Sequence, residues 1–99
     1  MHTVIRRYQG VTDTAEVARR AVEEFAPQLR DAPGSQGYWV VDAGGGVLAT
    51  ISVFDSEEAA EESTAAAATW VQENMPNQVP NPPQVTKGDT TGVSAEVPA

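Results

Sequence analysis

The chain of 99 residues contains no cysteine, one histidine, and six basic residues against fourteen acidic ones. Without cysteine, no disulfide framework, thiolate nucleophile or cysteine-based metal site can form. The single histidine, His2, gives no partner for a histidine metal site or a Ser-His-Asp triad, so we expect no metal and place His2 in solvent at a frayed N-terminus. The net charge of −8 repels phosphate backbones, which argues against a nucleic-acid partner.

Long apolar runs are also missing. No stretch approaches the roughly 20 apolar residues of a membrane-spanning helix, and the first residues lack the apolar core of a signal peptide. We therefore expect a soluble cytoplasmic protein with no membrane partner. The length suggests one domain, which we place at residues 1–90. The chain after Asp89 contains threonine, serine and glycine, and residues 91–99 are expected to form a frayed tail.

Residues 37–54 are the most informative segment that is present, and they predict a β-hairpin. Gly44-Gly45-Gly46 permits the positive φ angles of a tight turn, and no helix or lysine follows it as in a phosphate-binding loop. Side chains alternate along a strand, so Tyr38 and Trp39 point to opposite faces. The second strand also carries apolar residues on both faces: Val47, Ala49, Ile51 and Val53 on one, Leu48 and Phe54 on the other. A sheet with one wet face would show polar residues at every second position, so each face needs a cover.

The elements around the hairpin complete an ordered pattern. Residues 3–9 have the β-branched and aromatic content of a strand. A helix follows, capped by Asp13, with Pro27 kinking or ending it near Ala26 and a last turn reaching Asp31. A second helix is predicted over residues 57–74 and a short strand over residues 84–89, joined by a proline-rich extended connector. The order β-α-β-β-α-β is the α+β ferredoxin-like pattern, a four-stranded antiparallel sheet with two helices on one face.

The second helix is expected to lie close to the sheet because its apolar stripe consists mostly of small residues. Trp70 is the one large side chain that it inserts. The glutamates at positions 57, 58, 61 and 62 form a solvated face and complement the helix dipole. The predicted buried stripe is Ala59, Ser63, Ala66, Ala67, Trp70 and Val71.

Two helices cover only one face of this sheet, while the hairpin is apolar on both. The simplest cover for the other face is the same face of a second copy, related by a two-fold axis. Burying each large apolar side chain contributes roughly 1.5–3 kcal/mol, and leaving several exposed would favour aggregation. We therefore predict a face-to-face homodimer, a dimeric α+β barrel with its helices outside.

Short stretches spread along this pattern carry a family resemblance. They are Val4-Ile-Arg-Arg-Tyr8 before a glycine, Phe25-Ala-Pro27 leading to Pro33-Gly34, Gly37-Tyr38, residues 52–58 (Ser-Val-Phe-Asp-Ser-Glu-Glu) and residues 68–74 (Ala-Thr-Trp-Val-Gln-Glu-Asn). On these stretches the chain resembles the antibiotic biosynthesis monooxygenase-like proteins of the dimeric α+β barrel superfamily. The resemblance covers roughly residues 3–90; it is specific for the fold and weak for activity.

The resemblance implies an activity class. The family's oxygenases work without a cofactor: they bind a polycyclic phenol between sheet and helices, and the substrate's own anion reduces oxygen. Trp70 matches the tryptophan associated with that site. The asparagine one turn earlier is replaced by Ala66, and the histidine of the haem-degrading branch has no counterpart. The expected cofactor is therefore none, and haem degradation is disfavoured.

Five residues are candidates for a ligand site: Trp70, Tyr38, Phe54, Arg6 and Arg7. Packing in the core or at the dimer interface is the ordinary explanation for the aromatic residues. Arg6 and Arg7 are adjacent in a strand, so one must point to each face. An arginine there either forms an ion pair with the acidic excess or anchors an anionic group of a ligand.

Three functions remain open from the sequence. The first is a small monooxygenase-like enzyme that oxidises an aromatic or polyketide-like molecule. The second is a non-catalytic dimeric barrel that binds a small apolar ligand or acts as an interaction module. The third, a lactone isomerase or similar proton-transfer enzyme, lacks a base, because no acid falls on a predicted inward stripe. No catalytic residue is assigned.

Overall fold

The structure, a computed structural model, describes residues 1–92, so most of the predicted tail lies outside the described residues. Its elements follow the predicted order, with the first helical segment divided into three. They are β1 (His2–Tyr8), α1 (Thr14–Arg20), η1 (Ala21–Phe25), α2 (Ala26–Asp31), β2 (Ser35–Gly44), β3 (Val47–Phe54), α3 (Glu57–Asn74) and β4 (Gln84–Asp89).

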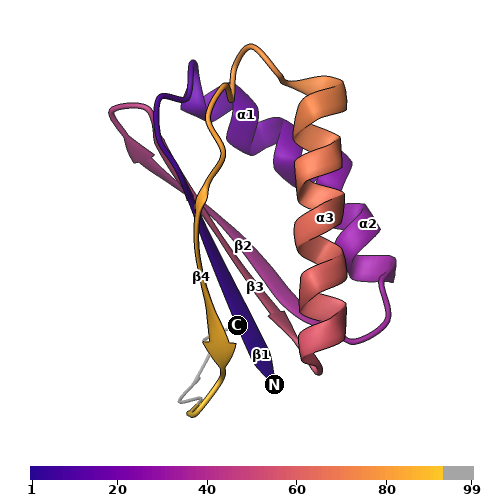
Figure 1. Cartoon of the computed structure of the whole chain (residues 1–99). Coiled ribbons are helices and arrows are strands. Elements are labelled where there is room, and N and C mark those ends of the chain that lie inside the picture. The colour runs from indigo at the N-terminus through magenta and orange to yellow at the C-terminus, as the bar shows by residue number, and fades with distance from the viewer. Residues whose placement is uncertain (93–99) are drawn as a thin grey trace, which may run out of the picture.

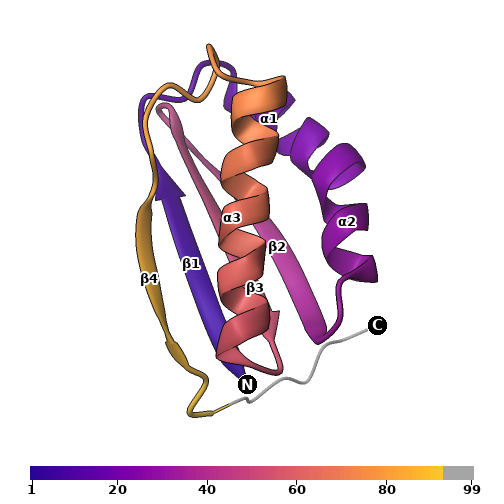
Figure 2. The same cartoon turned by 45° about the vertical axis from the view of Figure 1, so that its right-hand side comes forward.

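The four strands form one antiparallel sheet in the order β2-β3-β1-β4. The helices lie on one face of this sheet, and α3 runs along it beside the shorter helical segments (Figures 1 and 2). The predicted α+β ferredoxin-like fold is confirmed. The central strands β3 and β1 are paired on both sides, whereas β2 and β4 are edges. No helix within residues 1–92 has both the length and the apolar content to cross a membrane.

The two faces of the hairpin differ as the alternation predicts. On β3, every second residue is buried beneath the helices, from Leu48 to Phe54. The residues between them lie half-buried on the outer face. Trp39 of β2 lies on that outer face with 55% of its surface exposed, while Tyr38 packs edge-on against Phe25 at a ring-centroid distance of 6.0 Å. The turn between the strands contains three glycines with positive φ, as expected.

The first helical segment begins at a side-chain cap and changes its winding before the proline. Asp13 Oδ1 accepts a hydrogen bond from the Glu16 backbone N–H at 3.3 Å, which caps α1. The wider turn η1 ends where the Ala26 N–H donates to the Ala21 carbonyl, five residues back. Pro27, which has no N–H to donate, follows directly, and the helical stretch ends at Asp31.

Helix α3 has the predicted bounds, but its buried face is rotated slightly from the predicted stripe. Ser56 caps it, its Oγ accepting from the Ala59 N–H at 3.2 Å. The residues that become fully buried are Ala60, Ser63, Ala67 and Trp70. The prediction of Ala59 in the stripe is therefore corrected to Ala60. The buried positions are spaced three or four residues apart, which places them on one side of the helix, facing the sheet. Ala59, Ala66 and Val71 lie half-buried at the margin of that side.

The placement of His2 in solvent is wrong. β1 begins at His2, whose backbone is paired with Phe54 of β3 on one side and Asp89 of β4 on the other. An inward-facing side chain at a doubly paired position is covered by its neighbours, and only 7% of the His2 surface is exposed. His2 Nδ1 lies 3.5 Å from the exposed carboxylate of Asp89.

Candidate ligand-binding site

Arg6 lies on the helix-facing side of β1 and is 1% exposed. Its alternation with Val4 and Tyr8, both buried, fixes this orientation. All of its side-chain hydrogen bonds go to hydroxyl oxygens: to Ser52 Oγ at 3.4 Å, Ser63 Oγ at 2.9 Å and Thr64 Oγ1 at 2.8 Å. Among the described residues, no carboxylate forms an ion pair with Arg6. The inner face therefore carries a cation without a counter-ion.

Part of the hydrogen-bonding capacity at this point of the sheet is unused. Arg6 Nε and Thr50 Oγ1 are buried and lack a hydrogen-bond partner. Arg6 and Thr50 are opposite each other in the pairing of β1 with β3, so the two unpartnered groups are neighbours. Burial lowers the pKa of Arg6, yet a guanidinium stays protonated in proteins because its ordinary value lies above 12. The site therefore holds a buried charge with one donor that has no hydrogen-bond acceptor.

The chain's two tyrosines lie in the same electrostatic neighbourhood. Burial raises the pKa of Tyr8, and the nearby Arg6 opposes that rise. Burial raises the pKa of Tyr38 to about 12, with Tyr8 adding to the rise and Arg6 opposing it. Both phenols are therefore neutral at physiological pH and able to donate hydrogen bonds.

Two cavities meet at Arg6. The smaller, of about 30 Å³, lies beneath α3 and is lined mainly by apolar side chains, including Phe25 and Trp70. A space of this size holds a water molecule or two but no aromatic ring. Arg6, Tyr8, Val71 and Val79 line this cavity and also the larger one.

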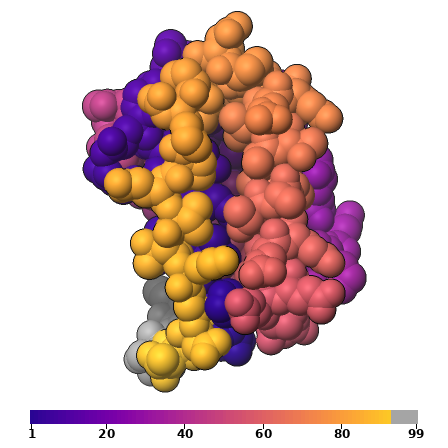
Figure 3. All heavy atoms as spheres, viewed as in Figure 1, coloured from indigo at the N-terminus to yellow at the C-terminus, as the bar shows by residue number. Residues whose placement is uncertain are grey.

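The larger cavity is a groove of about 580 Å³ between α3, β1, β4 and the proline-rich segment 76–83. Figure 3 shows the same hollow, with atoms of β1 visible between β4 and α3. This volume falls in the range of pockets for small organic molecules, roughly 300–1,000 Å³. Its walls are formed by Val71, Val79, Val85 and four prolines, with polar groups from Arg6, Tyr8, Thr64, Gln72 and Asn81.

The charge of the groove differs from that of the whole protein. The chain has fourteen acidic residues and a net charge of −8. Among the described residues that line the groove, none is aspartate, glutamate or histidine, and Arg6 is the only charged one. The groove is a locally positive, acid-free site on a strongly acidic protein.

The structure separates the five residues predicted to bind a ligand. Arg6 lines both cavities, and Tyr38 and Trp70 line the small one. Phe54 is 1% exposed and packs in the core without lining any of the described cavities. Arg7 points to the opposite, outer face and is exposed. Ligand binding by these residues stays a prediction, and the geometry favours Arg6 over Arg7.

Several residues of the groove were not candidates from the sequence. The sequence gives some indication that Tyr8 and Thr64 lie near Arg6. Tyr8 follows Arg6 by two residues in a strand and so shares its face, and Thr64 is next to Ser63, which was predicted to be buried. For residues 76–83, which form one wall of the groove, the sequence gives no such indication. The prolines of this segment predict an extended connector but not the surface against which it packs.

Solved structures of other proteins share this architecture, whereas comparisons of the sequence found no match. No family model matches the chain, and no curated protein matches it. Among solved structures, the NE2512 protein of unknown function from Nitrosomonas europaea superposes with a TM-score of 0.73 at 16% identity, over 99% of this chain and 94% of that one. An antibiotic biosynthesis monooxygenase superposes with a TM-score of 0.69 at 18% identity, over 93% of this chain and 100% of that one.

The chain has the antibiotic biosynthesis monooxygenase fold. A further match is a monooxygenase from the gene ActVA-Orf6 of Streptomyces coelicolor, solved in complex with the ligand nanaomycin D. It has a TM-score of 0.68 and 15% identity, and the match covers 99% of this chain and 92% of that one. At these identities the likeness concerns the fold, and at that level the resemblance stated from the sequence is confirmed.

Proposed function

We propose that the protein is a small antibiotic biosynthesis monooxygenase-like enzyme that oxidises an aromatic or polyketide-like molecule without a cofactor. The observation that carries the proposal is the groove of about 580 Å³ beside Arg6, within a fold shared with monooxygenases. The groove has apolar walls for a ring system and a few donors to orient it. The monooxygenase solved with nanaomycin D supports a small-molecule ligand.

A specific observation favours a second candidate, a non-catalytic dimeric barrel that binds a small apolar ligand. The cavity at Trp70 measures only about 30 Å³, so Trp70 and Phe25 fill the space between α3 and the sheet. A ligand in the groove would then be separated from the tryptophan that the resemblance associates with catalysis. The groove would bind without promoting a reaction.

Both candidates include a homodimer formed through the outer face of the sheet. Exposed apolar side chains gather there, with Trp39 55%, Val41 44% and Ile5 39% exposed. Covering such a patch stabilises the folded chain and reduces aggregation. Light scattering at micromolar concentration should give the mass of a dimer, and Trp39→Lys should give a monomer; a monomeric wild type would contradict the proposal. A cytoplasmic location stays an expectation from the sequence.

Oxygen uptake separates the two candidate functions. The protein is incubated with hydroxylated anthrones and quinols while dissolved oxygen is followed. The enzyme proposal expects uptake in excess of autoxidation, proportional to protein concentration and suppressed by Ala68→Phe, which places a ring in the groove. Thermal stabilisation by the same compounds without uptake would support the binding protein. Neither uptake nor stabilisation would remove both.

A further inference from the structure

We infer that the groove binds an aromatic acid that is already ionised in water, with its anionic group at Arg6 and its rings between α3 and the proline-rich segment 76–83. The inference deepens the proposed function, on which it rests for the location of the site. It specifies the charge of the ligand, the way in which that charge arises, and the direction in which the ligand lies.

The charge follows from the imbalance around Arg6. Its guanidinium is 1% exposed, bonded to three hydroxyl oxygens and unpartnered at Nε. A buried charge without a counter-ion is costly, and hydroxyl dipoles offset that cost only in part. An anion in the groove beside Arg6 would balance this charge at a point where no resident carboxylate competes.

The state in which the ligand arrives follows from the absence of a base. Within the described part of the chain, no aspartate, glutamate or histidine lines the groove, and Tyr8 is held neutral by its raised pKa. No lining side chain can therefore take a proton from a neutral ligand at physiological pH. The site selects compounds whose own pKa lies below 7, such as carboxylic acids and strongly acidified phenols.

The direction in which the ligand lies follows from the two volumes. The small cavity, of about 30 Å³, excludes a ring, whereas the groove, of about 580 Å³, admits two or three fused rings. Proline rings and valine side chains offer flat apolar walls to such a ring system. The ligand therefore extends from Arg6 toward the open side of the groove, past Ala68, rather than toward Trp70.

Calorimetric titration of the full chain with 2-naphthoate and with 2-naphthamide tests this directly, since the two probes share a shape and differ in charge. Naphthoate should bind about 10- to 100-fold more tightly, the range expected of a charge-assisted hydrogen bond in a buried site. Arg6→Met should abolish the preference for naphthoate over naphthamide. Equal binding of the two probes, a preference that survives in Arg6→Met, or no binding of naphthoate at millimolar concentration would each overturn the inference.

A matched pair on α3 locates the rings without disturbing Arg6. Ala68 and Ala65 are both exposed, three residues apart on the same helix, and only Ala68 lines the groove. Ala68→Phe should weaken both probes at least about tenfold, and Ala65→Phe should leave both unchanged. Identical effects of the two substitutions would place the ligand elsewhere. Neither probe is oxidised in these titrations, so a negative oxygen-uptake experiment would not contradict the inferred anion site. Turnover of neutral compounds alone would contradict the anion site and support the proposed enzyme.

Discussion

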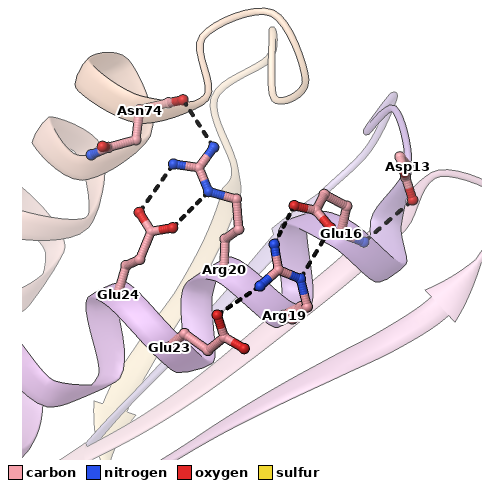
Figure 4. Close-up of polar contacts among 7 residues, drawn as sticks. All are labelled: Asp13, Glu16, Arg19, Arg20, Glu23, Glu24 and Asn74. Carbon is pink, nitrogen blue, oxygen red and sulfur yellow. Dashed lines mark hydrogen bonds and ion pairs between the residues drawn. The ribbon is translucent and has the colours of Figure 1, made fainter.

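Arg6 in the sheet and Arg19 and Arg20 in the first helical segment have opposite surroundings. Arg19 donates to the carboxylates of Glu16 and Glu23, and Arg20 donates to that of Glu24 and to the Asn74 carbonyl at the end of α3 (Figure 4). These pairs lie at the surface, where water screens them. Arg6 is buried and bonded only to hydroxyls.

The difference separates arginines whose charge is balanced by nearby carboxylates from one whose charge is not, and the second is the charge that we propose binds a ligand. A chain with fourteen acidic residues has ample carboxylates to neutralise six basic ones. The pairs of Arg19 and Arg20 are one turn apart on the helix, where side chains meet by geometry alone. Around Arg6 the elements supply serine and threonine instead, so the most deeply buried of these arginines has no acidic partner among the described residues.

The largest expected effect is a loss of ligand affinity when Arg6 is given a carboxylate partner like those of Arg19 and Arg20. Thr64→Asp places a carboxylate where Thr64 Oγ1 now accepts from Arg6 Nη2 at 2.8 Å. We expect the affinity for 2-naphthoate to fall by roughly 100-fold or more, because the resident carboxylate neutralises Arg6 and repels the probe. Thr69→Asp, at an exposed position on α3 outside the groove, is the matched control and should change the affinity little. Similar losses in both variants would point to a non-specific charge effect.

Alkaline titration should reveal the second largest effect. The phenol absorbance of the folded protein reports only Tyr8 and Tyr38, both beside Arg6, and Tyr38 should ionise with a pKa of about 12. A raised pKa in the folded state stabilises the fold below pH 10, and this contribution, up to about 3 kcal/mol, is lost as the pH rises from 10 to 12. Arg6→Met should raise both tyrosine pKa values further, since Arg6 lowers them. Two normal tyrosines with pKa values near 10 would contradict the buried site.

Arg6→Met should not destabilise the protein, although it replaces a buried and hydrogen-bonded side chain. Methionine fills much of the same space without a charge to desolvate, so the free energy of unfolding should stay unchanged or rise by about 1 kcal/mol in urea denaturation. A function-bearing charge often costs stability in this way. A loss above about 2 kcal/mol would identify Arg6 as a structural residue and remove the contrast with the surface arginines.

The smallest effects should come from those surface arginines. Arg19→Ala and Arg20→Ala should each lower the free energy of unfolding slightly, Arg20→Ala by more because Arg20 also bonds the Asn74 carbonyl. Both effects should disappear near 1 M salt. The lowered pKa values of Glu16 and Glu24, caused by hydrogen bonds from Arg19 and Arg20, stabilise the fold above pH 4.5 and lose that contribution as the pH falls further. Salt-independent losses would mean that packing, not charge, explains these contacts.

Much of the architecture was predictable because its signals are local. Asp13 and Ser56 each accept a hydrogen bond from a backbone N–H three residues later, and Pro27 and the three glycines determine the backbone angles at their own positions. Hydrophobic alternation along residues 37–54 defines both faces of the hairpin. The second helix and the final strand have the predicted bounds. The confirmed fold rests on these features.

The site was only partly predictable, because its composition depends on long-range packing. Alternation requires Arg6 and Arg7 to face opposite ways, but Val4 and Tyr8 on one side and Ile5 on the other are all apolar, so the sequence does not say which arginine is inside. The apolar stripe of the second helix centres on Trp70, whereas the groove opens at its margin near Ala68 and Gln72. His2 was misplaced because its burial depends on pairing with Phe54 and Asp89, which are 52 and 87 residues away in the sequence.

The proline-rich wall of the groove has a thermodynamic consequence. Segment 76–83 contains four prolines, which fix φ, and backbone hydrogen bonds from the Thr12 N–H to the Gln78 carbonyl at 2.9 Å and from the Val79 N–H to the Met75 carbonyl at 3.0 Å tie it down. A wall that is irregular yet already rigid loses little conformational entropy when a ligand arrives. We therefore expect the groove to be pre-organised, so that a ligand of the proposed kind would bind with a smaller ordering cost than a flexible loop would impose.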